Sequence, residues 1–459
     1  MHPERTHSFP SRRPFAFDRR AFHTAGLAFL LTVGSALGAE SWPDFRGPRG
    51  DGHVTTADGK AAGIPLEWSE SKNIKWKTEL PLLGLSSPVV MDGKVWLTTA
   101  TEDGREYYVL SVDAATGKVL TNEKLFQTVD PEPLGNGSKD NSYATPSCVV
   151  EPGRVYVHYG SPGTACLDAA TGKVLWKRDD LKCRHYRGAS SSPVLFGDLL
   201  ILTFDGADLQ YHVALDKRTG KNVWLTNRSV AWNDLNTGNK LALDGDWRKA
   251  HSTPLIVDWQ GQPLMFSAGA KAAYGYDPKT GKELWRVEHA SYSAAPRPVF
   301  RNGHFIFVTG FSAGAQMWSV KAGGKGVVTD THVDWKIATP IPKYSSPILV
   351  DDLLYVSMDD AFLACLEADT GTTIWKERVG GRFRACPIYA DGRLYFFSLE
   401  GVTTVIKPGR TFEVLATNTL TDGNAGNDPR RGPGFMASPA VVGKSLIVRT
   451  RHHLYRIEE

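Results

Sequence analysis

The stretch Ala165-Cys-Leu-Asp-Ala-Ala-Thr-Gly-Lys-Val-Leu-Trp-Lys177 decides the fold, because its parts recur along the chain. It consists of an apolar run, an Asp-x-x-Thr-Gly-Lys turn and a second run that carries a tryptophan. In such a turn the aspartate accepts backbone N–H bonds, and the glycine supplies the positive φ that other residues resist. The stretch therefore predicts two antiparallel strands joined by a tight, structural hairpin. A calcium loop is excluded because its alternating acids and final glutamate are absent.

The hairpin has further copies along the chain. Turns of the same kind lie at Asp113–Lys118, Asp216–Lys221, Asp277–Lys282 and Glu367–Gly371. A tryptophan closes several units, at Trp176, Trp224, Trp285 and Trp375, and Trp335 serves a unit that has lost the turn. A large ring at one repeated outer-strand position can pack between neighbouring units, so we expect these rings in the seams rather than on a ligand.

A second marker, a small-small-Pro triplet, opens each unit. The triplets lie at Ser86–Pro88, Ala144–Pro146, Ser191–Pro193, Ser252–Pro254, Ala294–Pro296, Ser345–Pro347, Ala385–Pro387 and Ala437–Pro439. Their mean spacing is about 50 residues, which suits one four-stranded propeller blade. The alternating apolar runs, rich in β-branched and aromatic residues, indicate strands rather than helices.

The two ends of the repeat region complete one another. The last triplet leaves room for only three strands before Glu459, whereas Ile74–Lys77 has the fourth-strand pattern and no unit of its own. Pairing these two ends removes both exposed strand edges. We therefore predict an all-β fold, an eight-bladed β-propeller of four-stranded antiparallel blades over residues 74–459. The N-terminal strand completes the last blade, and residues 40–73 form a lead-in segment.

Residues 1–39 have the features of an export signal. A basic stretch ends at Arg19-Arg20, and an apolar run follows from Ala25 to Leu37. Arg19-Arg20-Ala-Phe resembles a twin-arginine signal, and an ordinary secretory signal is the alternative. We expect a periplasmic or extracellular protein with no transmembrane segment in the mature chain. Without this leader the net charge falls from +4 to +1, which argues against a nucleic-acid partner.

Residues 165–177 resemble the pyrroloquinoline-quinone repeat of quinoprotein alcohol dehydrogenases and of the outer-membrane barrel-assembly lipoprotein. The opening Trp42-Pro-Asp-Phe-Arg-Gly47, with Gly50-Asp-Gly52, resembles the start of uncharacterised exported propellers of this family. The resemblance covers residues 42–459. It implies the fold and not the activity, because the repeat belongs to the scaffold.

The chain departs from both kinds of relative. Quinoprotein alcohol dehydrogenases typically stack the quinone on a disulfide between adjacent cysteines and bind calcium through a Glu, Asn and Asp set. No motif here matches that set, and the lipoprotein's lipid-modified cysteine is absent. The cysteines are Cys148, Cys166, Cys183, Cys365 and Cys386, none of them adjacent. Their odd number leaves at least one thiol free unless two chains are linked, and no spacing resembles a zinc site. Cys166 and Cys365, at equivalent places, are interpreted as buried small hydrophobes.

The functional candidates gather at one mouth of the predicted ring. Insertions at 126–141, 226–249 and 421–434 precede first strands, so they share a face with the loops between second and third strands, opposite the Thr-Gly turns. Binding loops on a rigid scaffold concentrate in this way. The ligand candidates just before the triplets are Arg187, Arg248, His251, Tyr344 and Arg384. Acids from the facing loops join them: Glu102, Asp103, Asp205, Asp208, Asp359, Asp360 and Glu400.

Arginine and tyrosine side chains suit an anionic or hydroxyl-rich ligand, through forked hydrogen bonds and stacking. The alternative is that these groups pair with each other and with the inserted loops and merely fill the axis. His185 and His251 can act as bases, but the sequence places no nucleophile beside either, so no catalytic residue is assigned.

Two functions compete on these residues. In the first, the propeller is a non-catalytic binding or scaffolding protein that holds a protein or a glycan at its mouth, with no cofactor and no metal. In the second, implied by the resemblance, it is a dehydrogenase of alcohols or sugars that uses pyrroloquinoline quinone with calcium. There the arginines would grip the quinone's carboxylates and a mouth acid would hold the metal. An unrelated hydrolytic activity is a third alternative.

Overall fold

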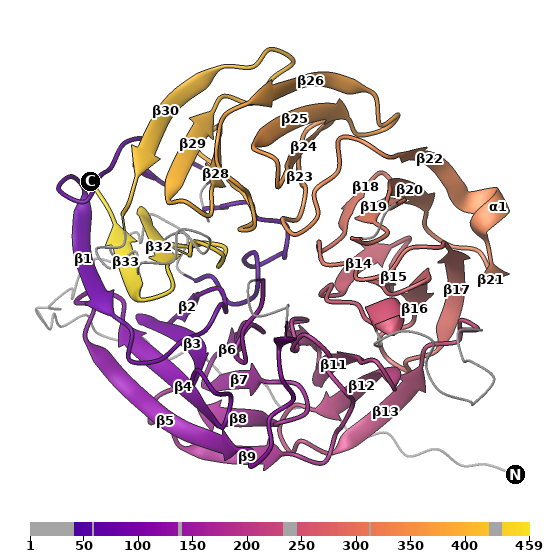
Figure 1. Ribbon diagram of the computed structural model, residues 1–459, viewed down its shortest axis with the longest axis horizontal. Coiled ribbons are helices and arrows are strands. Elements are labelled where there is room, and N and C mark those ends of the chain that lie inside the picture. The colour runs from indigo at the N-terminus through magenta and orange to yellow at the C-terminus, as the bar shows by residue number, and fades with distance from the viewer. Residues whose placement is uncertain (1–40, 57–58, 136–139, 233–245, 312–313, 422–433) are drawn as a thin grey trace, which may run out of the picture. The chain divides into compact units, whose positions relative to one another are not determined.

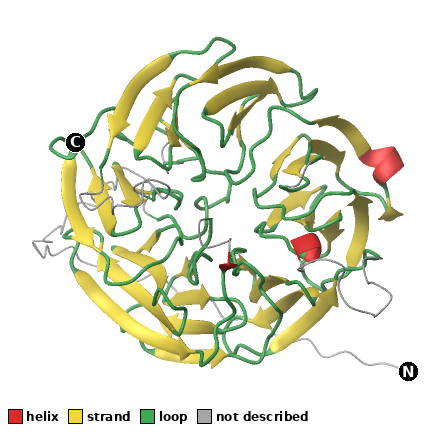
Figure 2. Ribbon diagram, in the orientation of Figure 1, coloured by secondary structure: helices red, strands yellow, loops and turns green. Residues whose placement is uncertain are grey.

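The computed structural model describes residues 41–56, 59–135, 140–232, 246–311, 314–421 and 434–459, all within the unit Leu37–Glu459. These residues form eight antiparallel β-sheets arranged as a ring of blades (Figure 1). Strands make up nearly all of the regular structure (Figure 2), together with the helix α1 (Thr329–His332) and a 3₁₀ turn at Asp246–Arg248. The predicted eight-bladed propeller is confirmed.

The blades follow the chain in order. Blade 1 holds β2 (Val89–Met91), β3 (Lys94–Ala100), β4 (Glu106–Asp113) and β5 (Val119–Gln127). Blade 2 holds β6 (Val149–Glu151), β7 (Arg154–His158), β8 (Thr164–Asp168) and β9 (Val174–Arg178). Blade 3 holds β10 (Val194–Phe196), β11 (Leu199–Asp205), β12 (Gln210–Asp216) and β13 (Asn222–Asn227). Blade 4 holds β14 (Leu255–Trp259), β15 (Gln262–Ala268), β16 (Ala272–Tyr276) and β17 (Glu283–Glu288), and β21 (Gly326–Val327) adds to it in parallel.

The second half of the ring repeats the plan. Blade 5 holds β18 (Val299–Arg301), β19 (His304–Val308), β20 (Met317–Lys321) and β22 (Val333–Ile337). Blade 6 holds β23 (Ile348–Val350), β24 (Leu353–Ser357), β25 (Phe362–Glu367) and β26 (Thr373–Arg378). Blade 7 holds β27 (Ile388–Ala390), β28 (Arg393–Phe397), β29 (Val402–Ile406) and β30 (Val414–Thr419). Blade 8 joins β31 (Ala440–Val442), β32 (Ser445–Arg449) and β33 (His453–Ile457) with β1 (Ile74–Glu79) from the other end of the sheet region.

Blade 8 closes the ring as the sequence predicts. Strand β1 pairs antiparallel with β33, with Ile74 opposite Ile457 and Thr78 opposite Leu454. Because β1 bonds to β33, blade 8 has its fourth strand and β33 has no unpaired edge. Figure 1 shows the indigo strand β1 beside the yellow strand β33.

The tryptophans fasten neighbouring blades on the face of the Thr-Gly turns. Trp176 lies against Gly220 in the turn of the next blade, and its Nε1 donates to the Lys217 carbonyl at 3.0 Å. A Cβ on Gly220 would stand 2.7 Å from the ring, so only glycine fits this position, where φ is +71°. The same indole-to-turn bond is made by Trp76, Trp224, Trp335 and Trp375. The predicted packing in the seams is confirmed.

Trp285 is the exception, because the next blade has lost the turn. Strand β21 and helix α1 occupy the chain between β20 and β22 instead. The Trp285 ring is fully buried near Phe266, and its Nε1 has no hydrogen-bond partner among the described residues. The contact is thus a property of the pair of blades and not of the tryptophan alone.

The hydrophobic core lies in the layers between adjacent blades. Between blades 2 and 3, for example, Tyr156 and Cys166 pack with Leu202 and Leu215. All five cysteines are buried free thiols, and Cys166 and Cys365 are fully buried, as expected for small hydrophobes.

Candidate functional site: an axial funnel

A belt of hydrogen bonds surrounds the axis where each blade begins. The residue two positions before each first strand is buried, and in seven of the eight blades it carries a hydroxyl or a thiol. The backbone N–H of one such residue donates to the side chain of the next blade's residue. These bonds run from Ser87 to Ser147 (2.9 Å), Ser147 to Ser192 (3.0 Å), Ser192 to Thr253 (3.0 Å), Arg297 to Ser346 (2.9 Å), Ser346 to Cys386 (3.3 Å), Cys386 to Ser438 (2.9 Å) and Ser438 to Ser87 (3.0 Å). We call these eight residues the axial belt.

The belt corrects the register of two triplets. In blades 2 and 5 the structurally equivalent residues are Ser147 and Arg297, two positions after Thr145 and Ala295. The triplets mark every blade correctly, but their central residues are not all equivalent, because β6 and β18 begin two residues later relative to their prolines. Arg297 is the one belt residue without a hydroxyl or thiol, and no belt bond joins Thr253 to it.

Arg297 instead anchors a segment of the lead-in, residues 42–54, which we call the axial plug. Its guanidinium donates to the Phe45 carbonyl at 2.7 Å and lies 3.5 Å from the Asp44 carboxylate. The plug also forms bridges to the first strands of blades 1 and 7, from Trp42 to Val90 and from His53 to Tyr389. These contacts place the plug inside the ring, where Figure 1 draws it in indigo.

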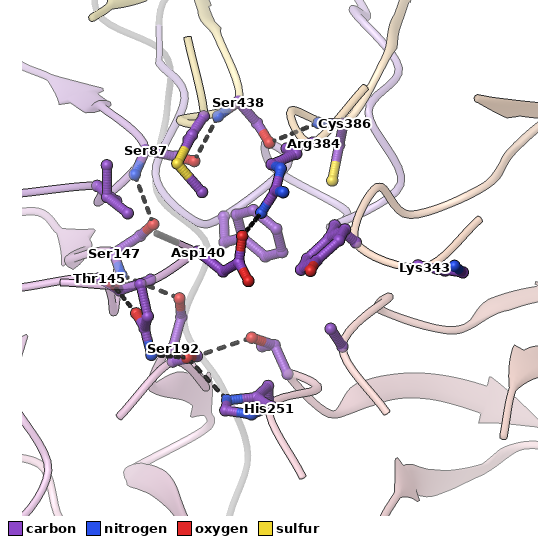
Figure 3. A pocket seen from close by; sticks show the side chains of 18 of the residues that line it. Ser87, Asp140, Thr145, Ser147, Ser192, His251, Lys343, Arg384, Cys386 and Ser438 are labelled. Carbon is purple, nitrogen blue, oxygen red and sulfur yellow. Dashed lines mark hydrogen bonds and ion pairs between the residues drawn. The ribbon is translucent and has the colours of Figure 1, made fainter. Parts of the chain in front are cut away.

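Between the belt and the mouth lies a funnel with a volume of about 200 Å³ (Figure 3). Phe45 of the plug contributes to its lining. So do the belt residues Ser87, Ser147, Ser192, Thr253, Cys386 and Ser438. The rim contributes Asp140, Asn141, Arg187, Ser190, His251, Phe311, Lys343, Tyr344 and Arg384. Most of these groups come from different blades, so the funnel exists only once the ring has closed.

Four of the five predicted ligand candidates line the funnel together: Arg187, His251, Tyr344 and Arg384. The fifth, Arg248, does not line it and lies over the ring of Trp232 at 5.3 Å. Of the three insertions, residues 136–139, 233–245 and 422–433 lie outside the described residues. The described end of the first insertion reaches the funnel through Asp140 and Asn141.

The funnel carries more positive than negative charge. Asp140 is the one acid among the described lining residues, and it forms an ion pair with Arg384. The Arg384 guanidinium also stacks on Tyr344 at 4.1 Å. Arg187 and Lys343 add two further cationic groups, and the Lys343 ammonium lies 5.1 Å from the centre of the Phe311 ring. Cationic and aromatic groups alternate along this side, as suits an anionic ligand with apolar parts.

His251 is held as a neutral imidazole. Burial lowers its pKa well below the usual value, and the nearby charges of Lys249 and Arg187 lower it further. Its Nδ1 lies 2.9 Å from Ser190 Oγ, and Asn141 donates to the same hydroxyl at 2.9 Å. Sequence reasoning missed this serine because it lies 61 residues away. No carboxylate bonds to His251 in the described chain, so the contact lacks the orienting acid of a hydrolytic triad.

His185, the second candidate base, lies outside the funnel lining. Burial and the Lys249 charge lower its pKa, and its Nε2 lies 3.4 Å from Cys183 Sγ. Burial also raises the pKa of the Cys183 thiol to about 12, so a thiolate nucleophile is disfavoured at this position.

Several mouth acids are occupied by arginines. Asp205 forms a buried bidentate pair with Arg228, and Glu400 bonds to Arg382 at 2.8 Å. Together with the pair of Asp140 and Arg384, these contacts match the alternative in which mouth groups pair with one another. In the described part of the chain no group of three or more His, Cys, Asp or Glu side chains is arranged to hold a metal ion.

Asp359 differs from these paired acids. Burial raises the pKa of its carboxyl to about 6, although the charges of Arg384 and Lys343 oppose the shift. Its Oδ1 is buried and has no hydrogen-bond partner among the described residues. The charge beside the rim therefore changes between mildly acidic and neutral pH.

The chain belongs to a known family of repeat propellers. The family model described as "Outer membrane protein assembly factor BamB" matches residues 68–242 and 269–408, more than half of the chain. The protein is therefore a pyrroloquinoline-quinone-repeat propeller, as the sequence resemblance implied. No helix in the described residues is long and apolar enough to cross a membrane.

Individual proteins with similar sequences match only part of this chain. The chain is 29% identical over 238 residues to the dehydrogenase subunit of a quinone alcohol dehydrogenase from Komagataeibacter europaeus, covering 46% of this chain and 29% of that protein. A protein of the same name from Acetobacter aceti is 34% identical over 155 residues, 31% of this chain and 19% of that protein. The chain thus matches less than a third of the length of these relatives. The designed protein Ika8 shares the fold, with a TM-score of 0.53 at 9% identity over 83% of this chain and 98% of its own.

Proposed function

We propose that this protein is an exported, non-catalytic binding or scaffolding protein whose axial funnel receives an acidic group of a partner protein. The charge of the funnel carries the proposal. Three cationic side chains, Arg187, Lys343 and Arg384, and a single acid line the described wall. Their surplus attracts an anion more strongly than a neutral glycan, because long-range charge complementarity steers association. A protein partner also suits a family described as an assembly factor.

The arrangement of the acids argues against a redox centre. A quinone site with calcium needs several carboxylate oxygens free to bind the metal. Asp140, Asp205 and Glu400 are each engaged by an arginine instead, and no three His, Cys, Asp or Glu side chains of the described residues come together to hold a metal ion. The described residues therefore do not fit the calcium-quinone group implied by the names of the alcohol dehydrogenase relatives, and we derive no reaction through it.

Site-specific photo-crosslinking tests the proposed binding surface. A photoreactive residue at Tyr344, in the funnel, is expected to give a defined adduct with a partner in the producing cell. The same residue at Leu175, an exposed position of the outer strand β9, is the control and is expected to give none. Adducts from Leu175 with none from Tyr344 would place the binding surface on the outer strands of the blades and contradict the proposal.

A pair of arginine variants sharpens the test. Arg384→Ala removes a cation of the funnel and is expected to lower the yield of the Tyr344 adduct at least about tenfold, as expected for a close charge pair. Arg382→Ala removes an arginine that pairs with Glu400 and does not line the funnel, so the adduct is expected to persist. Equal losses in both variants would show that general mouth charge, and not the funnel, holds the partner.

A further inference from the structure

Five belt hydroxyls face the funnel with an unused hydrogen. They belong to Ser87, Ser147, Ser192, Thr253 and Ser438, and each side chain is at most 4% exposed. Each hydroxyl oxygen accepts one backbone N–H from the neighbouring blade. Within the residues that the structure describes, none of these five hydroxyls donates to another group. A hydroxyl has one donor hydrogen beside its acceptor positions, so five donors from five consecutive blades remain for a ligand.

The belt also strengthens these donors. A hydroxyl that accepts a hydrogen bond becomes a better donor, because bonds in a chain polarise one another. Figure 3 shows the chain of bonds from Cys386 through Ser438 and Ser87 to Ser147, with Arg384 and Asp140 beside it. A buried donor without an acceptor costs free energy, so a cation or a purely apolar occupant would leave this arc unsatisfied.

We propose that the arc of belt hydroxyls forms an oxyanion seat at the base of the funnel, which takes one carboxylate or phosphate group of the ligand. This inference rests on the proposed binding function of the same funnel and names the chemical group that the funnel holds. An oxyanion offers several lone pairs in a small volume, which lets one group satisfy several O–H donors at once. Lys343 adds a compensating positive charge from the rim.

The Asp140 carboxylate competes with an entering oxyanion for the Arg384 guanidinium. Asp140 already supplies a carboxylate to Arg384 inside the funnel. An entering oxyanion therefore meets both an occupied arginine and a like charge. Replacing Asp140 with its neutral amide removes the like charge and releases Arg384, so the seat predicts a gain of affinity from this single change.

Titration of the full chain with small oxyanions tests the seat. Calorimetry or NMR with inorganic phosphate and with acetate is expected to show saturable binding, at least about tenfold tighter in Asp140→Asn. The double variant Ser147→Ala/Ser192→Ala is expected to weaken binding at least about tenfold, because bonds to charged groups are the strong ones. Ser346→Ala is the matched control, since Ser346 accepts the same kind of belt bond but does not line the funnel. Circular dichroism verifies that each variant keeps its fold.

Competition with peptides distinguishes a protein carboxylate from a phosphoryl group as the occupant of the seat. If the seat takes a protein carboxylate, a peptide with a free C-terminus competes with acetate and its amidated form does not. If it takes a phosphoryl group, phosphate binds more tightly than acetate and the two peptides compete equally poorly. The inference is overturned if neither anion binds to the wild type or to Asp140→Asn at millimolar concentration, or if Ser346→Ala weakens binding as much as the double variant. A Tyr344 adduct that persists in that case leaves the proposed function standing without the seat.

Discussion

The two faces of the ring use their repeats in opposite ways. On the turn face, five tryptophans, from Trp76 to Trp375, make one and the same bond to the next blade's turn. At the mouth, the position two residues before the belt residue carries Ser190, His251, Tyr344 and Arg384 in four of the blades, and no two of these are alike. Repetition thus builds the scaffold, and ligand chemistry arises where the repeats diverge. The axial belt is the boundary, because it repeats like the scaffold and also lines the funnel.

The largest expected effect is on the turn face. Gly117→Ala brings a Cβ within 2.8 Å of the Trp76 ring at a backbone φ of +75°, so it combines strain with overpacking. We expect it to lower the free energy of unfolding in urea by about 3 kcal/mol. Gly93→Ala has a similar φ of +72° with nothing within 4 Å, so it is expected to cost only about 1 kcal/mol. Equal costs would mean that the indole contact does not require glycine.

A smaller effect is expected from Asp359 at the mouth. Its raised pKa means that the folded state binds the proton more tightly than the unfolded state, in which the carboxyl has its ordinary value of 3.8. The free energy of unfolding should therefore fall as pH rises from about 4 to about 6, by about 2 kcal/mol, and stay low above that window.

Asp359→Asn should abolish this part of the pH dependence and stabilise the protein at neutral pH, whereas Asp360→Asn, at an exposed neighbour, should not. Urea unfolding at about pH 4 and about pH 8 measures both variants. If the free energy of unfolding of Asp359→Asn depends on pH as steeply as that of the wild type, the titration belongs to another group. The same protonation makes the rim more positive, so oxyanions should bind more tightly at the lower pH.

The smallest effect distinguishes two seams of the turn face. Trp224→Phe loses the indole bond to the Pro278 carbonyl, whereas Trp285→Phe removes a buried N–H that has no partner among the described residues. We expect Trp224→Phe to cost about 1 kcal/mol more than Trp285→Phe, the net contribution of one hydrogen bond. Thermal unfolding of the two variants in parallel gives the difference. A larger cost for Trp285→Phe would contradict this expectation and show that the packing lost by the fully buried Trp285 ring outweighs one hydrogen bond.

The sequence predicted what is local and periodic. The hairpin turns, the tryptophan seams and the closure by Ile74–Lys77 follow from patterns within one repeat or from a count of strands. The funnel depends on contacts between distant residues, such as Asp140 with Arg384, 244 positions apart. The side of the ring that carries the ligand candidates was predicted, but their partners were not, because each loop's partner comes from another blade.

Two features of the axis are visible in the sequence, but their structural roles cannot be inferred from it. The Trp42–Gly52 motif is recognisable in the sequence, but nothing local in it indicates that it lies inside the ring. In the sequence the serines of the triplets are only small residues at strand starts, whereas the closed belt shows that their hydroxyls accept hydrogen bonds between blades. Arg297 shows the limit most clearly, because the triplet Ala294–Pro296 gave a register two residues before the observed one.

We propose that the funnel is a binding seat and not a redox centre. The most direct test of this proposal is the absorbance of the full chain after equilibration with micromolar pyrroloquinoline quinone and calcium, followed by gel filtration and a dye-reduction assay with simple alcohols. The paired acids of the mouth predict no retained quinone and no alcohol-dependent dye reduction. Stoichiometric quinone absorbance together with dye reduction would overturn this proposal and make the funnel a dehydrogenase site.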